Sequence, residues 1–223
     1  MGDLIRIGAD IGQRVDPTAF AVIEEHPRGD GVHYLCRAIE RLPLGTPYPR
    51  VADRLVGVAR YVRMQAEEEA ESRGREEPRQ VQMVVDATGV GTAIADLLRE
   101  RGEYPLAAFF THGDKYTRNG NQVSVGKAWM VSRLQALFQS DRIHLGRTAE
   151  TDALREELLD YEIRVDERAN DRYGAFKTGT HDDLVTALGL AVGPGDSMRG
   201  FGISSWLPDG DDDDDDDARA WLQ

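Results

Sequence analysis

The order in which strand-like and helix-like segments follow one another constrains this chain more than any other feature of its sequence. Alternating apolar residues predict three strands at the start, over Leu4–Asp10, Thr18–Glu25 and Val32–Leu42. Only a short break at 12–17 and a turn rich in proline and glycine at 27–31 separate them. Strands joined by such short connections pair antiparallel, so we expect an antiparallel meander of three strands.

From residue 50 onwards the apolar spacing changes to that of helices alternating with strands. It predicts a helix over 50–72, a strand Val81–Asp86, a helix Thr92–Arg101 and a short strand Leu106–Phe110. Strands separated by helices pair in parallel within one sheet. The sequence therefore predicts an α/β fold with a mixed sheet, antiparallel and then parallel, flanked by helices.

Shorter elements complete this pattern. In order they are a polar loop His112–Val125, a helix Lys127–Gln139, a short strand Ile143–Leu145, a helix Glu150–Leu159, a hairpin of Tyr161–Val165 with Tyr173–Lys177, and a helix His181–Val192. We expect residues 1–195 to form one domain and residues 196–223 to be an acidic tail without fixed structure.

The net charge of −13 argues against strong non-specific DNA binding by this chain alone. Residues 209–223 hold eight Asp and one Arg, which leaves a charge of −6 for the other 208 residues. Any nucleic acid would therefore have to be held by a local basic patch, by metal ions or by a partner domain.

Other bulk features exclude several classes of protein. No apolar run approaches the ~18 residues of a membrane span, and the first predicted strand leaves no room for a signal peptide. Cys36 is the only cysteine, which excludes a disulfide framework and a cysteine-rich zinc site. Its strand-like surroundings favour a buried structural thiol. We expect a cytoplasmic protein.

Four aspartates fall where predicted strands end or where the last helix begins. Asp10 ends the first strand, Asp86 ends the fourth, and Asp182 and Asp183 open the last helix. A single Asp at such a position is usually a turn or capping residue. Together, however, these four can converge, and the glycines beside Asp10 and Asp86 let a ligand approach. Carboxylates in such places are costly for folding unless they bind something cationic.

Helical spacing separates the roles of the two adjacent aspartates. Asp183 shares a stripe with Ala187, which should lie on the sheet, whereas Asp182 shares the more polar stripe of Thr186. We therefore expect Asp183 to point towards the strand ends and Asp182 towards solvent or a supporting role. His181 is suited to cap the helix, to orient a carboxylate or to act as an outer ligand.

A cluster of carboxylates stays ionised only if cations offset its repulsion. Oxygen ligands favour hard ions, so we expect Mg²⁺ or Mn²⁺ rather than zinc. Two such ions about 4 Å apart can activate water and stabilise the leaving oxygen in phosphodiester hydrolysis. The pattern thus indicates a metal-dependent phosphodiester hydrolase.

Three motifs taken together resemble the nuclease domain of viral large terminases, which belongs to the ribonuclease H-like superfamily. The motifs are Ile7–Gly12 with 16–19, Val85–Gly91 and His181–Leu188, and the resemblance runs from about residue 4 to 192. It implies a ribonuclease H-like fold and endonucleolytic cleavage of concatemeric, double-stranded bacteriophage DNA during genome packaging.

The resemblance also implies roles for individual residues. Asp10, Asp86 and Asp183 would ligate the two divalent ions, Asp182 would complete the catalytic set, and His181 would stand behind the ligands. The predicted hairpin would lie beside the active site. The candidates for DNA binding are Arg172 and Lys177 in that hairpin, and Lys115, Arg118 and Lys127 in and after the polar loop.

A complete terminase also carries an ATPase motor, and we find no matching phosphate loop. The nearest candidate, Gly120 to Ala128, has one residue too many between its glycines and an alanine where Ser or Thr should reach magnesium. The motor, and with it the portal and the small terminase, would be partners encoded outside this sequence.

Three alternative functions stay open. Another ribonuclease H-like nuclease, such as a junction resolvase, would share the acidic cluster. The glycine-flanked Ile7–Gly12 and Val85–Gly91 faintly resemble the phosphate loops of actin-like ATP-binding proteins, in which Asp182 and Asp183 would have no obvious role. A docking module for DNA or portal that kept the fold and lost the activity is disfavoured by four intact acidic residues.

Overall fold

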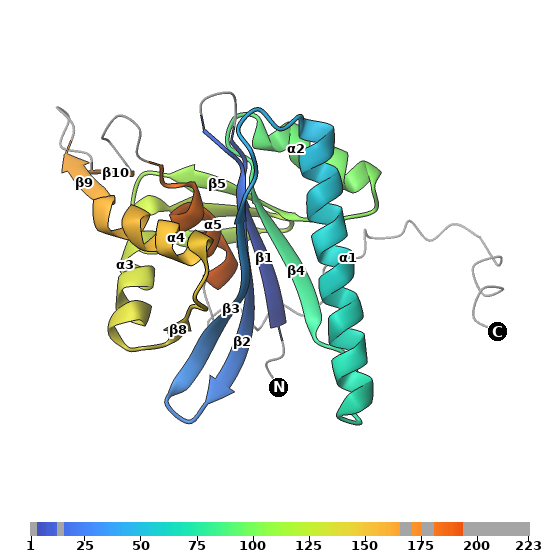
Figure 1. The fold of residues 1–223 in the computed structure, drawn as a ribbon. Coiled ribbons are helices and arrows are strands. Elements are labelled where there is room, and N and C mark those ends of the chain that lie inside the picture. Colours follow the sequence, from blue (N-terminus) through green and yellow to red (C-terminus); the bar gives the residue numbers. More distant parts are fainter. Residues whose placement is uncertain (1–3, 13–15, 166–170, 175–180, 194–223) are drawn as a thin grey trace.

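The computed structural model describes residues 4–12, 16–165, 171–174 and 181–193, with the backbone alone at 160, 162–165 and 171–174. Within these ranges the chain forms ten strands and five helices (Figure 1). The strands are β1 (Leu4–Asp10), β2 (Ala19–Arg28), β3 (Gly31–Arg41), β4 (Gln80–Asp86), β5 (Leu106–Thr111), β6 (Tyr116–Asn119), β7 (Gln122–Gly126), β8 (Ile143–His144), β9 (Glu162–Val165) and β10 (Asp171–Gly174). The helices are α1 (Tyr48–Ser72), α2 (Gly91–Glu100), α3 (Lys127–Gln139), α4 (Ala149–Asp160) and α5 (Asp183–Val192).

Eight of the strands form one mixed sheet in the order β6-β7-β5-β4-β1-β2-β3-β8. β1, β2 and β3 pair antiparallel, whereas β1, β4, β5 and β7 run parallel. Both the predicted meander and the predicted parallel half are therefore confirmed. β9 and β10 pair as a separate antiparallel hairpin, as expected, and β10 begins at Asp171, two residues before the predicted Tyr173. The predicted residues 175–177 lie outside the described ranges.

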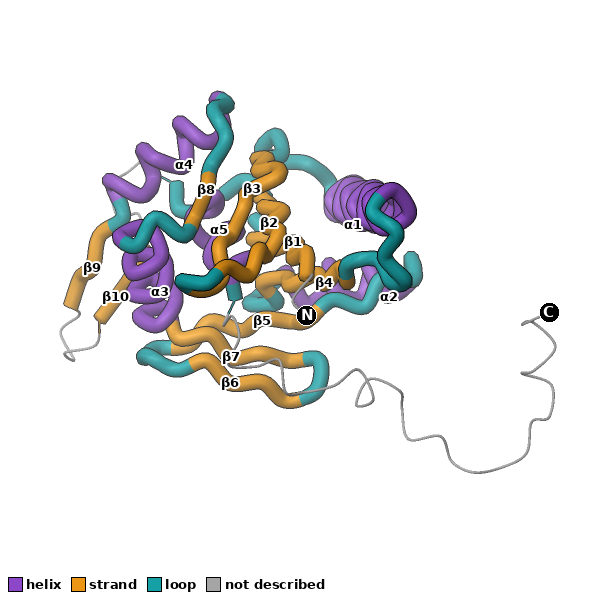
Figure 2. The backbone as a smooth tube through the Cα atoms, turned by 90° about the horizontal axis from the view of Figure 1, so that it is seen from below, coloured by secondary structure: helices purple, strands orange, loops and turns teal. Residues whose placement is uncertain are grey.

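Helices cover both faces of the sheet and enclose two apolar cores (Figures 1 and 2). α1 and α2 pack on one face and α3, α4 and α5 on the other. Alternation along β1 assigns its side chains to these layers: Ile5, Ile7 and Ala9 lie in the core under α1. Gly8 and Asp10 therefore face α5. None of the helices in the described ranges combines the length and apolarity needed to cross a membrane.

The buried helix α5 packs unusually closely on β1. A Cβ at Gly8 would clash with backbone atoms of Ala187 and Ala191, so only glycine permits this approach. At the C-terminal end of α5, the Arg6 guanidinium donates to the Val192 carbonyl at 3.1 Å and pairs with Glu25 at 2.6 Å. These contacts fix the position of α5 along β1.

The region 112–125 was predicted as a polar loop, and this prediction is wrong. It contains β6 and β7, which form a hairpin at the edge of the sheet. Gly120 takes a φ of 55° at the first position of the two-residue turn, where glycine is favoured. Val123 and Val125 are buried, whereas Gln122 and Ser124 are less so, and this alternation is the strand signal that the polar composition concealed.

The second strand extends to Arg28 and so includes Pro27, where we had predicted a turn. Among the described residues Pro27 pairs with Val32 of β3. Proline lacks only the backbone N–H donor, so a strand can include it where its nitrogen makes no bond to the neighbouring strand. The predicted tail 196–223 lies outside the described residues.

Cys36 is half-buried at the margin of the core, so it is less enclosed than predicted. Burial raises the pKa of its thiol to about 11, and the thiol donates to the Ala38 carbonyl at 3.5 Å. The protonated, unreactive form agrees with a structural role.

The contact of Gly8 with α5 can be tested by stability measurements. Gly8→Ala should lower the free energy of unfolding by about 1–3 kcal/mol, because the added methyl group overpacks the interface with α5. Gly57→Ala is the matched control: it lies inside α1 with open space around it, and should raise stability by about 0.5–1 kcal/mol. Urea denaturation of both variants gives the comparison, and equal stability of the two would contradict the packing argument.

Candidate active site

Two aspartates lie side by side because they end neighbouring parallel strands. Asp10 is the last residue of β1 and Asp86 the last of β4, each directly after the paired residues Ala9 and Val85. Both are partly exposed at the end of the sheet. The carboxyl ends of parallel strands lie at the same edge of a sheet. Asp10 and Asp86 therefore lie next to each other, although 76 positions separate them in the sequence.

The start of α5 brings two more aspartates to the same edge. α5 packs against β1 through Gly8, two residues before Asp10, so its N-terminal end lies at the end of the strand. Asp183 is 3% exposed, whereas Asp182 is only partly buried. The predicted distinction between a buried Asp183 and a more exposed Asp182 agrees with this arrangement.

The pKa of Asp10 shows that all four carboxyl groups lie close together. Burial raises its pKa well above the ordinary value, and the negative charges of Asp86, Asp182 and Asp183 raise it further, in that order. Asp182 therefore acts on Asp10 more strongly than Asp183 does, although it is the more exposed of the pair. The four aspartates predicted from the sequence thus share one electrostatic environment.

The loop after β4 holds the Asp86 carboxylate. The Thr88 backbone N–H donates to Asp86 Oδ1 at 2.8 Å, and the Thr88 hydroxyl accepts from Phe110 N–H at 3.3 Å. Gly91 begins α2 where any Cβ would clash with the Asp86 carbonyl. Burial raises the pKa of Asp86, while its hydrogen bonds with Thr88, the charge of Lys127 and a hydrogen bond with Asp10 lower it.

Lys127 lies near enough to the acidic cluster for its charge to act on two of the aspartates. It begins α3 directly after β7, and its charge lowers the pKa of both Asp10 and Asp86. Its ammonium lies 5.5 Å from the centroid of the Phe110 ring. One cation therefore faces two of the aspartates from the parallel half of the sheet.

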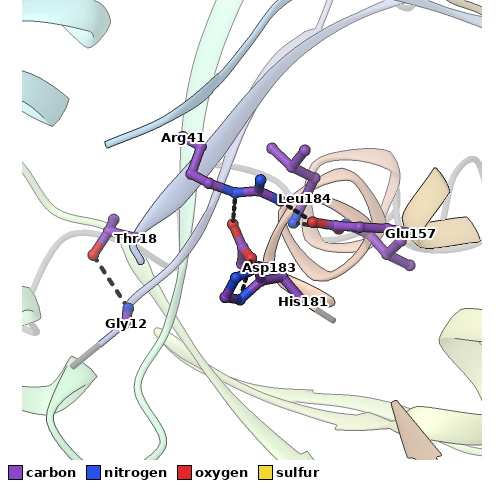
Figure 3. A network of polar contacts seen from close by, with 8 residues as sticks. Gly12, Thr18, Arg41, Glu157, His181, Asp183 and Leu184 are labelled. Carbon is purple, nitrogen blue, oxygen red and sulfur yellow. Dashed lines mark hydrogen bonds and ion pairs between the residues drawn. The ribbon is translucent and has the colours of Figure 1, made fainter. Parts of the chain in front are cut away.

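Asp183 is held by a network that the sequence did not predict (Figure 3). Arg41, the last residue of β3, donates from Nε to Asp183 Oδ2 at 2.7 Å and from its other arm to Glu157 of α4. The second oxygen of Glu157 accepts from the backbone N–H groups of Leu184 and Val185 at 3.0 and 3.2 Å. Glu157 therefore caps α5, whose N-cap residue makes no side-chain cap bond.

Burial raises the pKa of Glu157 to about 7, and the charge of Asp183 raises it as well, whereas Arg41 and the two backbone donors lower it. The pKa of Asp183 is raised by burial and lowered by the hydrogen bond and charge of Arg41. A pattern in the sequence could have indicated Glu157: it is three residues after the buried Leu154, on the apolar face of its helix.

Two buried polar atoms at this place have no hydrogen-bond partner among the described residues: Asp183 Oδ1 and His181 Nδ1. They lie 3.9 Å apart. A buried carboxylate oxygen without a donor is costly, and a cation would satisfy it. In the described ranges no three His, Cys, Asp or Glu side chains are already grouped as a metal site. The residues nevertheless fit a divalent cation by charge, by donor type and by this unsatisfied oxygen.

The predicted DNA-binding residues are spread over both ends of the sheet. Lys115 is exposed and precedes β6 at the site end, where its carbonyl accepts from Gly126 N–H at 2.7 Å. Arg118 lies further along β6, donates to the Gly120 carbonyl at 2.9 Å and is near Arg6, whose charge helps burial to lower the pKa of Arg118. Neither the side chain of Arg172 nor any part of Lys177 is among the described residues.

No protein-family model matches the chain, and no curated protein matches its sequence. Solved structures do match its fold. The large terminase nuclease from thermophilic phage G20c superposes with a TM-score of 0.55 at 20% identity, over 85% of this chain and 81% of that one. The fold is that of the terminase nucleases.

Two further structures agree. The nuclease domain of the Thermus phage P74-26 large terminase gives a TM-score of 0.56 at 19% identity, over 90% and 84% of the two chains. The human cytomegalovirus terminase nuclease domain gives 0.51 at 14% identity, over 86% and 82%. The predicted ribonuclease H-like fold is confirmed. The G20c nuclease was also solved with bound magnesium and with bound cobalt.

The raised pKa of Asp10 predicts how stability depends on pH without metal. The native state holds the Asp10 proton more tightly than the unfolded chain does, so the free energy of unfolding falls as pH rises from the unfolded pKa towards the raised native one. Asp10→Asn removes this penalty and should raise the thermal midpoint in EDTA, more at pH 7 than at pH 4. Asp96→Asn, on the exposed face of α2, should show no such trend.

Proposed function

We propose that this chain is a metal-dependent endonuclease domain that cleaves double-stranded viral DNA during genome packaging. The observation that carries the proposal is the convergence of Asp10, Asp86, Asp182 and Asp183 at one end of the sheet, expressed in the raised pKa of Asp10. The likeness in fold to large terminase nucleases supports it, and so does the metal bound in the G20c structures.

Asp10, Asp86 and Asp183 are the residues that would hold the cations, two Mg²⁺ or Mn²⁺ ions in our proposal. When bound, such ions supply an activated water and stabilise the leaving oxygen of a phosphodiester. Asp183 offers the unsatisfied Oδ1, while Asp10 and Asp86 offer adjacent carboxylates from neighbouring strands. Asp182 adds negative charge at the same place, and His181 lies behind Asp183.

Lys127 is suited to meet the DNA backbone at this site. Its charge acts on Asp10 and Asp86, the carboxylates to which the bound cations would bring a phosphate. It would therefore contact the scissile phosphate or its neighbour, whereas Lys115 and the hairpin residues Arg172 and Lys177 would contact flanking DNA. Contacts of this kind position the duplex without reading its sequence. A motor ATPase, a portal and a small terminase would be the partners that place the cut.

Substitution of the proposed ligands tests the site. Asp10→Asn and Asp183→Asn should each reduce plasmid cleavage in Mn²⁺ by more than ~100-fold, because even residues behind a metal ligand contribute about 10- to 100-fold. Asp182→Asn should cost less, since Asp182 is partly exposed and makes no cap bond that fixes it. Cleavage is read on agarose gels, with circular dichroism to confirm that each variant is folded.

Asp96→Asn serves as the control for the loss of one negative charge and should cleave normally. Cleavage at the wild-type rate by folded Asp10→Asn or Asp183→Asn would contradict the proposed metal site. Equal losses for Asp182→Asn and Asp183→Asn would show that the two adjacent aspartates contribute alike.

The choice of substrate separates this proposal from a junction resolvase of the same fold. A packaging nuclease should cut linear duplex and a four-way junction at similar rates, within about threefold, because contacts to the DNA backbone do not require a branch. The measurement is initial cleavage of labelled linear and four-way substrates of equal length in Mn²⁺. A strong preference for the junction would favour the resolvase.

A further inference from the structure

We infer that Arg41 and Glu157 act as a positioning pair that holds the Asp183 carboxylate in the orientation needed to bind a cation. This inference rests on the proposed function. Neither residue belongs to the motifs that indicated the site, and they come from β3 and α4 rather than from the elements that carry the four aspartates.

The geometry of the network supports this role. Arg41 engages one oxygen of Asp183, Oδ2, and so leaves Oδ1 without a hydrogen-bond partner among the described residues, with His181 Nδ1 3.9 Å away. The guanidinium cannot rotate freely, because its other arm is bonded to Glu157. A planar fork that is held at both ends fixes the carboxylate more strictly than a single bond would.

Glu157 connects this orientation to the position of the helix itself. One of its oxygens contacts Arg41 and the other accepts from Leu184 and Val185, the residues that follow Asp183 in the first turn of α5. The first turn of α5 is therefore held directly by the Glu157 carboxylate, and the Asp183 side chain is held by the same carboxylate through Arg41. Glu157 and Asp183 are both buried, with side-chain exposures of 7% and 4%.

Charge alone makes the opposite prediction from positioning. Arg41 is a cation next to a site for cations, so by Coulomb's law its removal should strengthen metal binding. If Arg41 acts by orienting Asp183, its removal should weaken metal binding instead. The sign of the effect therefore discriminates between the two roles.

The test is calorimetric titration of Mn²⁺ into the full chain. Arg41→Gln and Arg41→Lys should each weaken binding by about 10-fold, the lower end of the effect expected for residues behind metal ligands. The lysine variant keeps the charge and loses the two-armed fork. Glu157→Gln should weaken binding to a similar degree, because its amide keeps an acceptor for the cap but turns a donor towards Arg41. The double variant Arg41→Lys/Glu157→Gln should be no weaker than Arg41→Lys, since the two residues act through one contact.

Arg54→Gln is the matched control. Arg54 lies in α1, on the face of the sheet opposite to α5, and pairs there with Glu40, the residue before Arg41 in β3. It should bind Mn²⁺ normally. Thermal midpoints in EDTA identify any variant that fails to fold. If Arg41→Gln does not fold, Mn²⁺ binding by Arg41→Lys tests the positioning role.

If Asp10→Asn abolishes Mn²⁺ binding, the proposed function stands and the other variants test the positioning role by itself. Normal Mn²⁺ binding by Arg41→Lys and Glu157→Gln, or tighter binding by Arg41→Gln, then overturns that role. Unchanged binding by Asp10→Asn, or no binding by the unaltered chain, overturns the proposed function and this inference with it.

Discussion

The close packing of α5 on β1 is the constraint on which the acidic site depends. Gly8 lets the helix backbone approach the strand, and Arg6 holds the last turn of the helix through the Val192 carbonyl. With the helix fixed in this way, its first residues have only one place to lie, beside the end of β1. Asp183 is thereby brought to Asp10 from the far end of the described chain. A shift of α5 by one helical turn would move Asp183 by about 5.4 Å and separate it from the other aspartates.

The cluster works against the stability of the fold. Burial and mutual repulsion raise the pKa of Asp10, so each ionised carboxylate added at this edge costs free energy. In the described part of the chain the charge of Lys127 acts on Asp10 and Asp86, and Arg41 is bonded to Asp183, which leaves two cationic side chains against four aspartates in these interactions. A sequence under selection for stability alone would not retain such an arrangement, which is why its presence argues for a ligand.

The parts of the structure that follow from local periodicity were predictable. Strand ends and a helix start are local properties, so Asp10, Asp86 and Asp183 were found from the sequence without knowledge of their distances. Arg41 and Glu157 were not found, because their roles arise from how α4 and β3 meet α5. The position of Glu157 on the apolar face of its helix could have indicated a buried carboxylate, but not its contacts with Arg41 and α5. The hairpin of β6 and β7 was missed for a different reason: its edge strand is polar, and a polar strand resembles a loop in composition.

Lys127 was predicted to begin a helix after the polar loop and to be a candidate for DNA binding. β7 leads to it at the end of the sheet, where its charge acts on Asp10 and Asp86. This placement bears on how a chain of net charge −13 could engage DNA at all. In our proposal the acidic edge would repel phosphate until divalent cations reverse its local charge, and Lys127 would then add to the attraction. In our proposal the same ions that carry the chemistry also permit the substrate to approach, so binding of DNA at this edge and metal loading are one linked equilibrium.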